Sequence, residues 1–422
     1  MTDQKPTDVA SASLSLQGFE VAYVEIRPAP TRANPSRRIK VLGLCDVRGF
    51  HVCSECSKKH SEAAWQEFEP RRFRECSIGD FETYLEITPW RVNCCGGTRV
   101  ESFPWEAPGH RMTRRFFERI AALCTRLPVQ EVASMAGLSW DTVARVDKKA
   151  IELGLGGHQP DLGKLQWVGV DEVSRTGGHD YFTIVTNLRT GAVVHIGDGK
   201  GKKGLQSFLE RLSKSQRKRI QGTASDLGYL NLLRRAFPKA NHVLDRFHIV
   251  KWVNDALNAL RREEFGAAPR IGSGKVIKAK KWMLLSGREK LEQTHKLELA
   301  KLMKLNRRLY RGYLLKEELR TILKHPWQYM TSLRKNLQNW CNATIRSRLE
   351  PLKQVARRLR PHFDAIVAAY DAHIPLGLVE EINGKIANLR RVAHGYKDRE
   401  YFKLKIYQRC SLPDNPWRRI VL

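Results

Sequence analysis

The fold of the larger part of this chain is decided by residues 165–199, LQWVGVDEVSRTGGHDYFTIVTNLRTGAVVHIGDG. Three apolar runs rich in β-branched and aromatic residues occupy 165–173, 179–188 and 191–199, and the turn NLRTG joins the last two. Such runs predict three successive strands. Helix and strand patterns then alternate at 204–212, 219–226, 229–237 and 240–245. This order favours a mixed sheet with helices on its faces.

Length and charge limit the class of protein. The chain has 422 residues, too many for one compact core, and its 74 Lys+Arg against 44 Asp+Glu give a formal net charge of +30. Such a charge favours nucleic acid or an anionic membrane as the partner. No run of about 18 apolar residues occurs, and the first residues have no signal-peptide core. We therefore expect a cytoplasmic, nucleoid-associated bacterial protein that binds nucleic acid, with an anionic membrane as the weaker option.

Two aspartates follow apolar runs in a chain that is otherwise basic. Asp171 comes after LQWVGV and Asp226 after the next predicted core strand. Carboxylates at the ends of adjacent core strands can meet and hold Mg²⁺ or Mn²⁺, which suits phosphoryl transfer on nucleic acid. Each aspartate could instead simply cap a strand end. Asp245 also ends a predicted strand and could support the site, and His248 either contacts a phosphate or is a buried helix residue.

A third acid is expected on the helix predicted over 378–396. It carries Glu380 and Glu381 beside an apolar stripe of Ile382, Ile386 and Leu389. At 100° per residue the two glutamates cannot face one point, and periodicity places Glu381 nearer the stripe. Either glutamate could also be a solvated surface charge.

Seven of the nine cysteines lie in the first third of the chain, which indicates a local metal site in a reducing compartment. Cys53 and Cys56 form a CxxC knuckle, the usual half of a tetrahedral zinc site. The adjacent pair Cys94 and Cys95 stands where a second CxxC is expected. Other candidates for the fourth ligand are Cys76, His51 and His60, and a finger without metal is the alternative.

A helix-turn-helix is predicted over residues 129–149, with the turn at 136–138 and Ser139 as the N-cap of the second helix. Val143 and Val146 are expected to face inward. The residues left free to meet DNA are Trp140, Thr142, Arg145 and Lys149.

The segment 250–350 is helical in pattern and strongly basic. We expect it to grip DNA, with Lys280 and Lys281 among its contacts. Trp282 lies among these lysines and is either a core residue or a side chain that stacks on an unpaired base.

Several blocks, in order along residues 40–420, resemble the ISL-three family of DDE-type insertion-sequence transposases. The first-aspartate block is VGVDEVSRTGGHDYFTIVTNL and the second is SDLGYLNLLRRAFPKANHVLDRFHIVK. The late block LVEEINGKIANLRRVAHGYKDREYFKLKI resembles the family's Val-Glu-Gly-Ile-Asn helix, and the helical insertion is matched by KAKKWMLLSGREKL and YLLKEELR. In this chain Glu381 replaces the family's Gly after the catalytic Glu.

The resemblance implies a multidomain α+β protein with an RNase H-like catalytic domain. Its implied catalytic and metal-binding triad is Asp171, Asp226 and Glu380, and Cys53, Cys56, Cys94 and Cys95 would hold Zn²⁺ in a zinc-ribbon-like finger. The expected parts are a finger domain at 1–110, a helix-turn-helix at 111–160, the first catalytic part at 161–250, the basic insertion at 251–350 and the second catalytic part, with the Glu helix, at 351–422.

The implied function is a transposase that binds its element's terminal inverted repeats, cleaves the ends and transfers the freed strand to target DNA. A homodimer or larger assembly on DNA would hold the two ends together. The alternatives are a transposase-derived regulator that binds DNA without cutting it, and a metal-dependent resolvase or nuclease acting on branched DNA.

Overall fold

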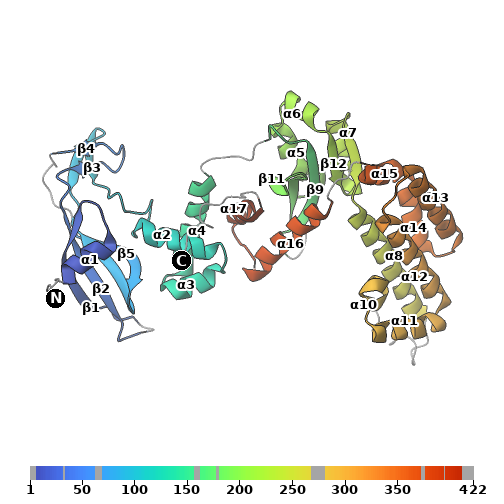
Figure 1. Cartoon of the computed structure of the whole chain (residues 1–422), viewed down its shortest axis with the longest axis horizontal. Coiled ribbons are helices and arrows are strands. Elements are labelled where there is room, and N and C mark those ends of the chain that lie inside the picture. The colour runs from blue at the N-terminus through green and yellow to red at the C-terminus, as the bar shows by residue number, and fades with distance from the viewer. Residues whose placement is uncertain are drawn as a thin grey trace. The chain divides into compact units, whose positions relative to one another are not determined.

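The structure is a computed structural model that describes residues 6–31, 34–61, 69–155, 162–176, 180–267, 281–371, 376–393 and 395–410 (Figure 1). The chain divides into two compact units, and the boundary lies between residues 158 and 159. This boundary falls within the Gly- and Pro-containing segment 154–164. In the described part of the chain, no helix is long and apolar enough to cross a membrane.

The first unit begins with helix α1 (Pro6–Leu14) and a four-stranded sheet. The sheet order is β1 (Phe19–Pro28), β2 (Arg38–Asp46), β6 (Phe81–Ile87) and β5 (Arg71–Ile78), with β2 and β6 parallel and the other pairs antiparallel. Its core contains the edge-to-face rings of Phe19, Phe73 and Trp105. Two small hairpins complete this part: β3 (His51–Val52) with β4 (Lys59–His60), and β7 (Arg91–Cys94) with β8 (Gly97–Val100).

Three helices follow in the same unit: α2 (Arg114–Cys124), α3 (Val129–Ala136) and α4 (Trp140–Leu155). Gly137 ends α3 with φ +66°, a left-handed conformation that favours glycine. The Ser139 hydroxyl accepts a hydrogen bond from the backbone N–H of Thr142, as expected of an N-cap. Val143 and Val146 are fully buried, so the predicted helix-turn-helix and its inward face are confirmed.

The second unit is built on a five-stranded sheet in the order β11 (Ala192–Asp198), β10 (Tyr181–Asn187), β9 (Trp167–Ser174), β12 (Gly222–Ser225) and β13 (Asn241–Leu244). Strands β9, β10 and β11 form an antiparallel meander, while β12 and β13 run parallel to β9. The predicted meander followed by alternating helices and strands is confirmed.

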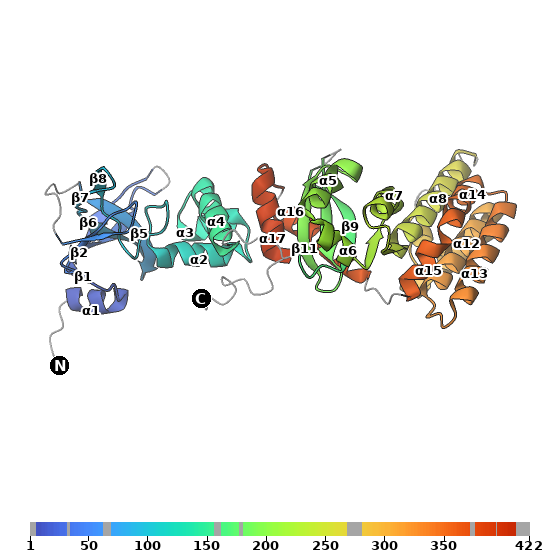
Figure 2. The same cartoon turned by 90° about the horizontal axis from the view of Figure 1, so that it is seen from above.

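Helices cover both faces of this sheet (Figure 2). Helices α5 (Gly201–Arg211) and α7 (Leu227–Ala236) pack on one face, and α6 (Lys214–Arg219) connects α5 to β12. Helices α16 (Gly377–Val392) and α17 (Arg399–Cys410) pack on the other face through Ile382, Ile386 and Phe402. The sheet therefore has a buried apolar layer of side chains on each face.

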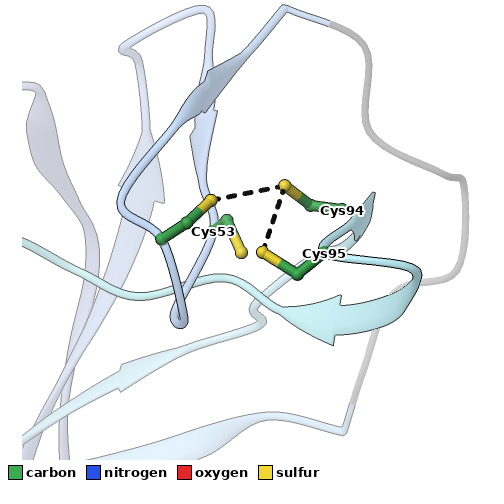
Figure 3. A group of neighbouring side chains, drawn as sticks. Cys53, Cys94 and Cys95 are labelled. Atoms are coloured by element: carbon green, nitrogen blue, oxygen red, sulfur yellow. Dashed lines mark hydrogen bonds between the residues drawn. The ribbon is translucent and has the colours of Figure 1, made fainter.

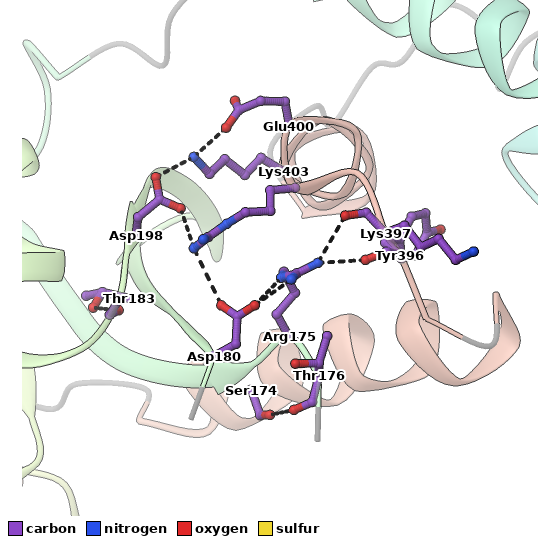
Figure 4. A network of polar contacts seen from close by, with 12 residues as sticks. Ser174, Arg175, Thr176, Asp180, Thr183, Asp198, Tyr396, Lys397, Glu400 and Lys403 are labelled. Atoms are coloured by element: carbon purple, nitrogen blue, oxygen red, sulfur yellow. Dashed lines mark hydrogen bonds and ion pairs between the residues drawn. The ribbon is translucent and has the colours of Figure 1, made fainter. Parts of the chain in front are cut away.

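A polar network fastens α17 to the meander (Figure 4). Arg175 pairs with Asp180 at 2.6 Å and donates to the carbonyl of Tyr396 at 2.8 Å. Lys403 pairs with Asp198 at the end of β11, with 2.9 Å between Nζ and Oδ2. These contacts hold the late helices against strands more than 200 positions earlier.

A bundle of helices is inserted between β13 and α16. It comprises α8 (Arg246–Ala267), α10 (Lys281–Leu285), η1 (Arg288–Lys290), α11 (Gln293–Leu305), α12 (Arg307–Lys324), α13 (Met330–Arg346), α14 (Glu350–Leu359), η2 (Arg360–His362) and α15 (Phe363–Asp371). Their shared core surrounds the fully buried Trp340 and extends to Ile366. The buried Lys316 donates to the carbonyls of Leu284 and Ser286, which ties α10 to α12.

Candidate active site and nucleic-acid interface

Three aspartates lie in one row across adjacent parallel strands. Ser225 of β12 pairs with Val170 of β9 and with Leu244 of β13. The next residue along each chain segment is Asp171, Asp226 or Asp245. Asp171 does not end its strand, as its sequence pattern suggests, because β9 continues to Ser174 alongside β10. It lies instead where the pairing of β9 with β12 stops.

The three aspartates also lie on one face of the sheet. The residues two positions before them, Gly169, Ala224 and Val243, face helix α16: a Cβ at Gly169 would lie 2.9 Å from Val379, and Ala224 and Val243 pack with that same valine. Side chains two positions apart on a strand point to the same face. The row of aspartates is therefore directed toward the side of the sheet that α16 covers.

Helix α16 directs Glu380, rather than Glu381, toward this row. Desolvation of its carboxylate and the nearby negative charges of Asp245 and Asp171 raise the pKa of Glu380. Glu381 instead forms an ion pair with Lys385, one turn later, with 2.6 Å between Oε1 and Nζ. Helical periodicity places Glu381 nearer the apolar stripe, but both glutamates are exposed, and Glu381 is the one that pairs with Lys385.

Asp245 and His248 lie within the same cluster. Burial, and after it the charge of Asp171, raises the pKa of Asp245, whose side chain accepts a hydrogen bond from the backbone N–H of Phe247 at 2.9 Å. His248 Nε2 lies 3.6 Å from Asp171 Oδ1. The histidine is buried at the start of α8, as one of its two interpretations predicts, and it also faces the acids.

Asp226 is held differently from its neighbours. It is the N-cap of α7, and its side chain accepts a hydrogen bond from the backbone N–H of Gly228. Asp171, Asp226 and Glu380 do not appear among the groups of described residues whose ligand atoms all lie within 4.8 Å of one another. The structure thus places Asp226 beside Asp171 by strand register, and brings Asp171 into the electrostatic surroundings of Glu380.

Sequence reasoning missed Asn383. Its Nδ2 donates a hydrogen bond of 2.6 Å to Asp171 Oδ2. The signal was available, because Asn383 lies three residues after Glu380, on the same side of a helix, and matches the Asn of the Val-Glu-Gly-Ile-Asn block. Only the glutamate was taken from that block as a functional residue.

The residues at this edge fit a hard divalent cation. The ligand atoms on offer are carboxylate oxygens and one amide oxygen, the donor type that Mg²⁺ and Mn²⁺ prefer. Asn383 Oδ1 is buried and has no hydrogen-bond partner among the described residues. A divalent cation at this edge would offset the repulsion among the carboxylates and would give this amide oxygen a partner.

Four cysteine sulfurs converge in the first unit (Figure 3). The Sγ atoms of Cys53, Cys56, Cys94 and Cys95 lie within 4.8 Å of one another, and Cys56 Sγ is 3.4 Å from Cys94 Sγ. Adjacent cysteines can share the group because Cys95 and Gly96 form the turn between β7 and β8 with φ +56° and +73°. Backbone amides of Cys56 and Glu55 lower the pKa of Cys53 to about 7, while the neighbouring thiols, Cys56 first, raise the pKa of Cys95 to about 12.

The other ligand candidates of the finger lie elsewhere. His51 pairs with Glu101, with 3.0 Å between Nδ1 and Oε2, and Arg48 neutralises the same carboxylate. Cys76 packs against the helix-turn-helix core. None of Cys76, His51 and His60 belongs to the cysteine group of the described residues.

The helix-turn-helix leaves a polar face open. Trp140 is 49% exposed and Arg145 is exposed, while Thr142 and Lys149 are partly exposed. Thr142 Oγ1 is 2.9 Å from Ser139 Oγ at the start of α4. All four predicted DNA-contacting residues are therefore accessible.

In the insertion, Lys280 lies outside the described residues, whereas Lys281 begins α10. Trp282 is 73% exposed, so its interpretation as a core residue is wrong. Lys281 Nζ lies 5.2 Å from the Trp282 ring centroid. The stacking interpretation of Trp282 stays a prediction.

Comparison with known proteins gives the class. A family model described as transposase, of the ISL3 DDE type, matches residues 168–406, and the helix-turn-helix domain of transposase family ISL3 matches residues 101–151. The first match covers more than half of the chain and contains the whole acidic cluster. The chain belongs to the ISL3 family of transposases, the ISL-three family that its sequence resembles.

Individual relatives agree with this assignment. The chain is 28% identical over 412 residues to the transposase for insertion sequence element IS1001 of Bordetella parapertussis, covering 94% of this chain and 96% of the relative. It is 27% identical over 372 residues to the transposase for insertion sequence element IS1557 of Mycobacterium tuberculosis, covering 82% of each. No solved structure matches the chain.

Proposed function

We propose that the chain binds the terminal inverted repeats of its own insertion sequence and catalyses metal-dependent end cleavage and strand transfer. The observation that carries this proposal is the row of Asp171, Asp226 and Asp245 on three adjacent parallel strands, facing the helix that bears Glu380. The sheet order, with a meander of three strands extended by two parallel ones, supports an RNase H-like catalytic domain.

The residues that would hold the divalent cations are Asp171, Asp226 and Glu380. When bound, Mg²⁺ or Mn²⁺ polarises the attacking and leaving oxygens of a phosphodiester. In cleavage, the oxygen of water forms a bond to phosphorus, the bond to the 3′ oxygen breaks, and the freed strand ends in a 3′-hydroxyl. In transfer, that hydroxyl attacks a phosphodiester of target DNA, and the target strand's own 3′ oxygen leaves.

The surrounding side chains orient the acids. Asn383 donates to one oxygen of Asp171, and His248 Nε2 lies 3.6 Å from the other. Asp245 is only 5% exposed and approaches from the third strand. These groups fix Asp171 from two sides, which leaves less motion to be lost when a phosphodiester binds.

DNA binding is assigned to the first unit and to the helical insertion. Trp140, Thr142, Arg145 and Lys149 of the helix-turn-helix would contact the repeat, and Lys281, with Lys280 before it, would contact the phosphate backbone. Zn²⁺ held by Cys53, Cys56, Cys94 and Cys95 would join the two small hairpins into a zinc-ribbon-like finger. A homodimer or larger assembly would hold the two element ends together.

The main alternative is a regulator that binds the same ends but does not cut. Glu381, in place of the Gly expected after the catalytic Glu, is the feature that keeps this alternative open. Its pairing with Lys385 directs the added charge into an ion pair on α16. That arrangement favours a working site over a disrupted one.

The test is to incubate the purified protein with labelled element-end duplex, target plasmid and Mg²⁺. A transposase nicks the duplex at the element end and joins the 3′ end to the plasmid. A regulator binds the duplex and yields no product. A resolvase cleaves branched junctions regardless of the end sequence, so a four-way junction of unrelated sequence serves as the control substrate.

A further inference from the structure

Asn383 is held against the sheet within the acidic cluster. Val379 and Ile386, four residues before it and three after, are buried on the sheet, so the side of α16 that carries Asn383 is the packed side. Its carboxamide reaches Asp171, a residue 212 positions earlier in the chain. The amide therefore has little freedom to turn away from the acids.

The orientation of the carboxamide follows from its contact with Asp171. A separation of 2.6 Å from a carboxylate oxygen requires a donor, and of the two ends of the amide only the NH₂ group can donate. The carbonyl end, Oδ1, is buried and has no hydrogen-bond partner among the residues that the structure describes. A buried amide oxygen that accepts no hydrogen bond destabilises the folded protein, so such an atom needs an explanation.

We propose that Asn383 has two roles in the site: its Nδ2 orients Asp171, and its Oδ1 is a neutral oxygen ligand for the divalent cation that Asp171 binds. This inference rests on the proposed metal-dependent function. Nδ2 and Oδ1 belong to one rigid planar group, so a hydrogen bond that fixes the first also fixes the second beside the carboxylate. Asn side chains are ordinary ligands of hard cations.

The neutral charge of the Asn383 amide also bears on its role as a ligand. Asp171, Asp226, Asp245 and Glu380 already gather negative charge at one edge of the sheet. An amide adds an oxygen without adding charge, so it does not increase the repulsion among these acids. Glu381 is held by its ion pair with Lys385, whereas the carboxamide of Asn383 reaches the acids through its hydrogen bond to Asp171.

The test measures Mn²⁺ binding by electron paramagnetic resonance of free Mn²⁺, with the full chain bound to uncut element-end duplex. Asn383→Ala removes both roles, and we expect Mn²⁺ to dissociate about tenfold more readily, the lower end of what supporting partners of a metal site contribute. Asn383→Asp keeps an oxygen and loses the donor, so its affinity should stay within about threefold of the original chain. Asn388→Ala is the matched control, because Asn388 is an exposed asparagine of the same helix whose Oδ1 accepts from Arg391.

The Mn²⁺ whose binding is lost in Asp171→Asn is the ion that belongs to this site. Unchanged affinity in Asn383→Ala, or affinity in Asn383→Asp as weak as in Asn383→Ala, would overturn the ligand role. If Asn383→Ala fails to fold, as judged by thermal unfolding without metal, Asn383→Asp and Asn383→Gln are compared with the original chain instead. A loss of Mn²⁺ affinity in both of these variants would overturn the ligand role. If the original chain neither binds Mn²⁺ at Asp171 nor joins ends, the proposed function fails; if it does both and the variants match it, only the role of Asn383 fails.

Discussion

At the scale of single residues, Glu380 and Glu381 are neighbours in sequence with different surroundings. Glu380 experiences the charges of Asp171 and Asp245, whereas Glu381 is paired with Lys385. We expect Glu380→Gln to reduce strand transfer by about 100-fold or more, because the variant loses one of the negative charges proposed to hold the cation. Glu381→Gln, the matched control, should stay within about threefold of the original rate. Equal losses in the two variants would contradict the assignment of Glu380.

The buried His195 on β11 should make the stability of the second unit depend on pH. Burial, and then the charge of Arg211, lowers the pKa of His195 to about 4. The unfolded chain takes up a proton near pH 6.5 and the folded chain does not, so stability is complete above that pH and is lost as the pH falls toward about 4. Between pH 6.5 and pH 5 the free energy of unfolding should fall by about 1–2 kcal/mol.

His195→Gln is the variant that tests this. Glutamine can still accept from Arg211 and donate to Ser207, the two partners of the imidazole, but it does not titrate. Its free energy of unfolding, from urea titrations of the metal-free protein at both pH values, should fall less than that of the original chain. A parallel fall in both proteins would show that other groups are responsible.

At the scale of elements, the cysteine hairpins are too small to hold themselves together. Strands β3 and β4 have two residues each, and β7 and β8 have four. Such short hairpins are at best marginally stable in water without a further staple. If zinc joins the four sulfurs, chelation should loosen the finger and weaken binding to element-end DNA, while the sheet domain, in the other compact unit, keeps its stability.

Differential scanning calorimetry with and without chelator, combined with a zinc assay, measures this. Cys56→Ser should reproduce the chelated state, and Cys45→Ser is the control because Cys45 is exposed and stands apart from the cysteine group. One zinc per chain in the purified protein is expected. A metal-free protein whose DNA binding resists chelation would contradict the finger.

The strands and helices of the second unit were largely readable from sequence, because their patterns are local. Alternating apolar runs around Asp171 and the turn at 187–191 gave the meander, and β12 and β13 followed from short apolar runs before Asp226 and Asp245. The four-stranded sheet of the first unit was not readable in the same way. Strand β2 pairs with β6 although the β3–β4 hairpin and β5 lie between them in the chain, and local periodicity does not encode such a long-range pairing.

At the scale of the whole molecule, the site is assembled from distant parts of the chain. The aspartates lie within 75 residues of one another, but Glu380 and Asn383 come after the entire helical insertion. A helical wheel of α16 alone places Glu381 nearer the apolar stripe, because the wheel does not include the sheet on which the helix packs. Resemblance to a family gave Glu380, and only the packing of α16 on β9 revealed Asn383.

The molecule also separates its charges by task. With 74 Lys+Arg against 44 Asp+Glu, the chain as a whole carries an excess of positive charge, while Asp171, Asp226 and Asp245 lie in one row on the sheet, near Glu380 of α16. This separation suits a protein that holds a polyanion and reacts with it through cations. The central claim is therefore that these acids perform strand transfer.

The most direct measurement is joining of labelled element-end DNA to a target plasmid with Mg²⁺ or Mn²⁺, comparing the original chain with Asp226→Asn and Asp255→Asn. The first substitution removes a charge from the proposed site and keeps its shape, and the second removes an exposed charge from α8, outside the row of aspartates. Joined products from the original chain and Asp255→Asn, with none from Asp226→Asn, are the predicted result. Equal joining by all three proteins would contradict the active site, and end binding without product from any of them would contradict the transposase activity.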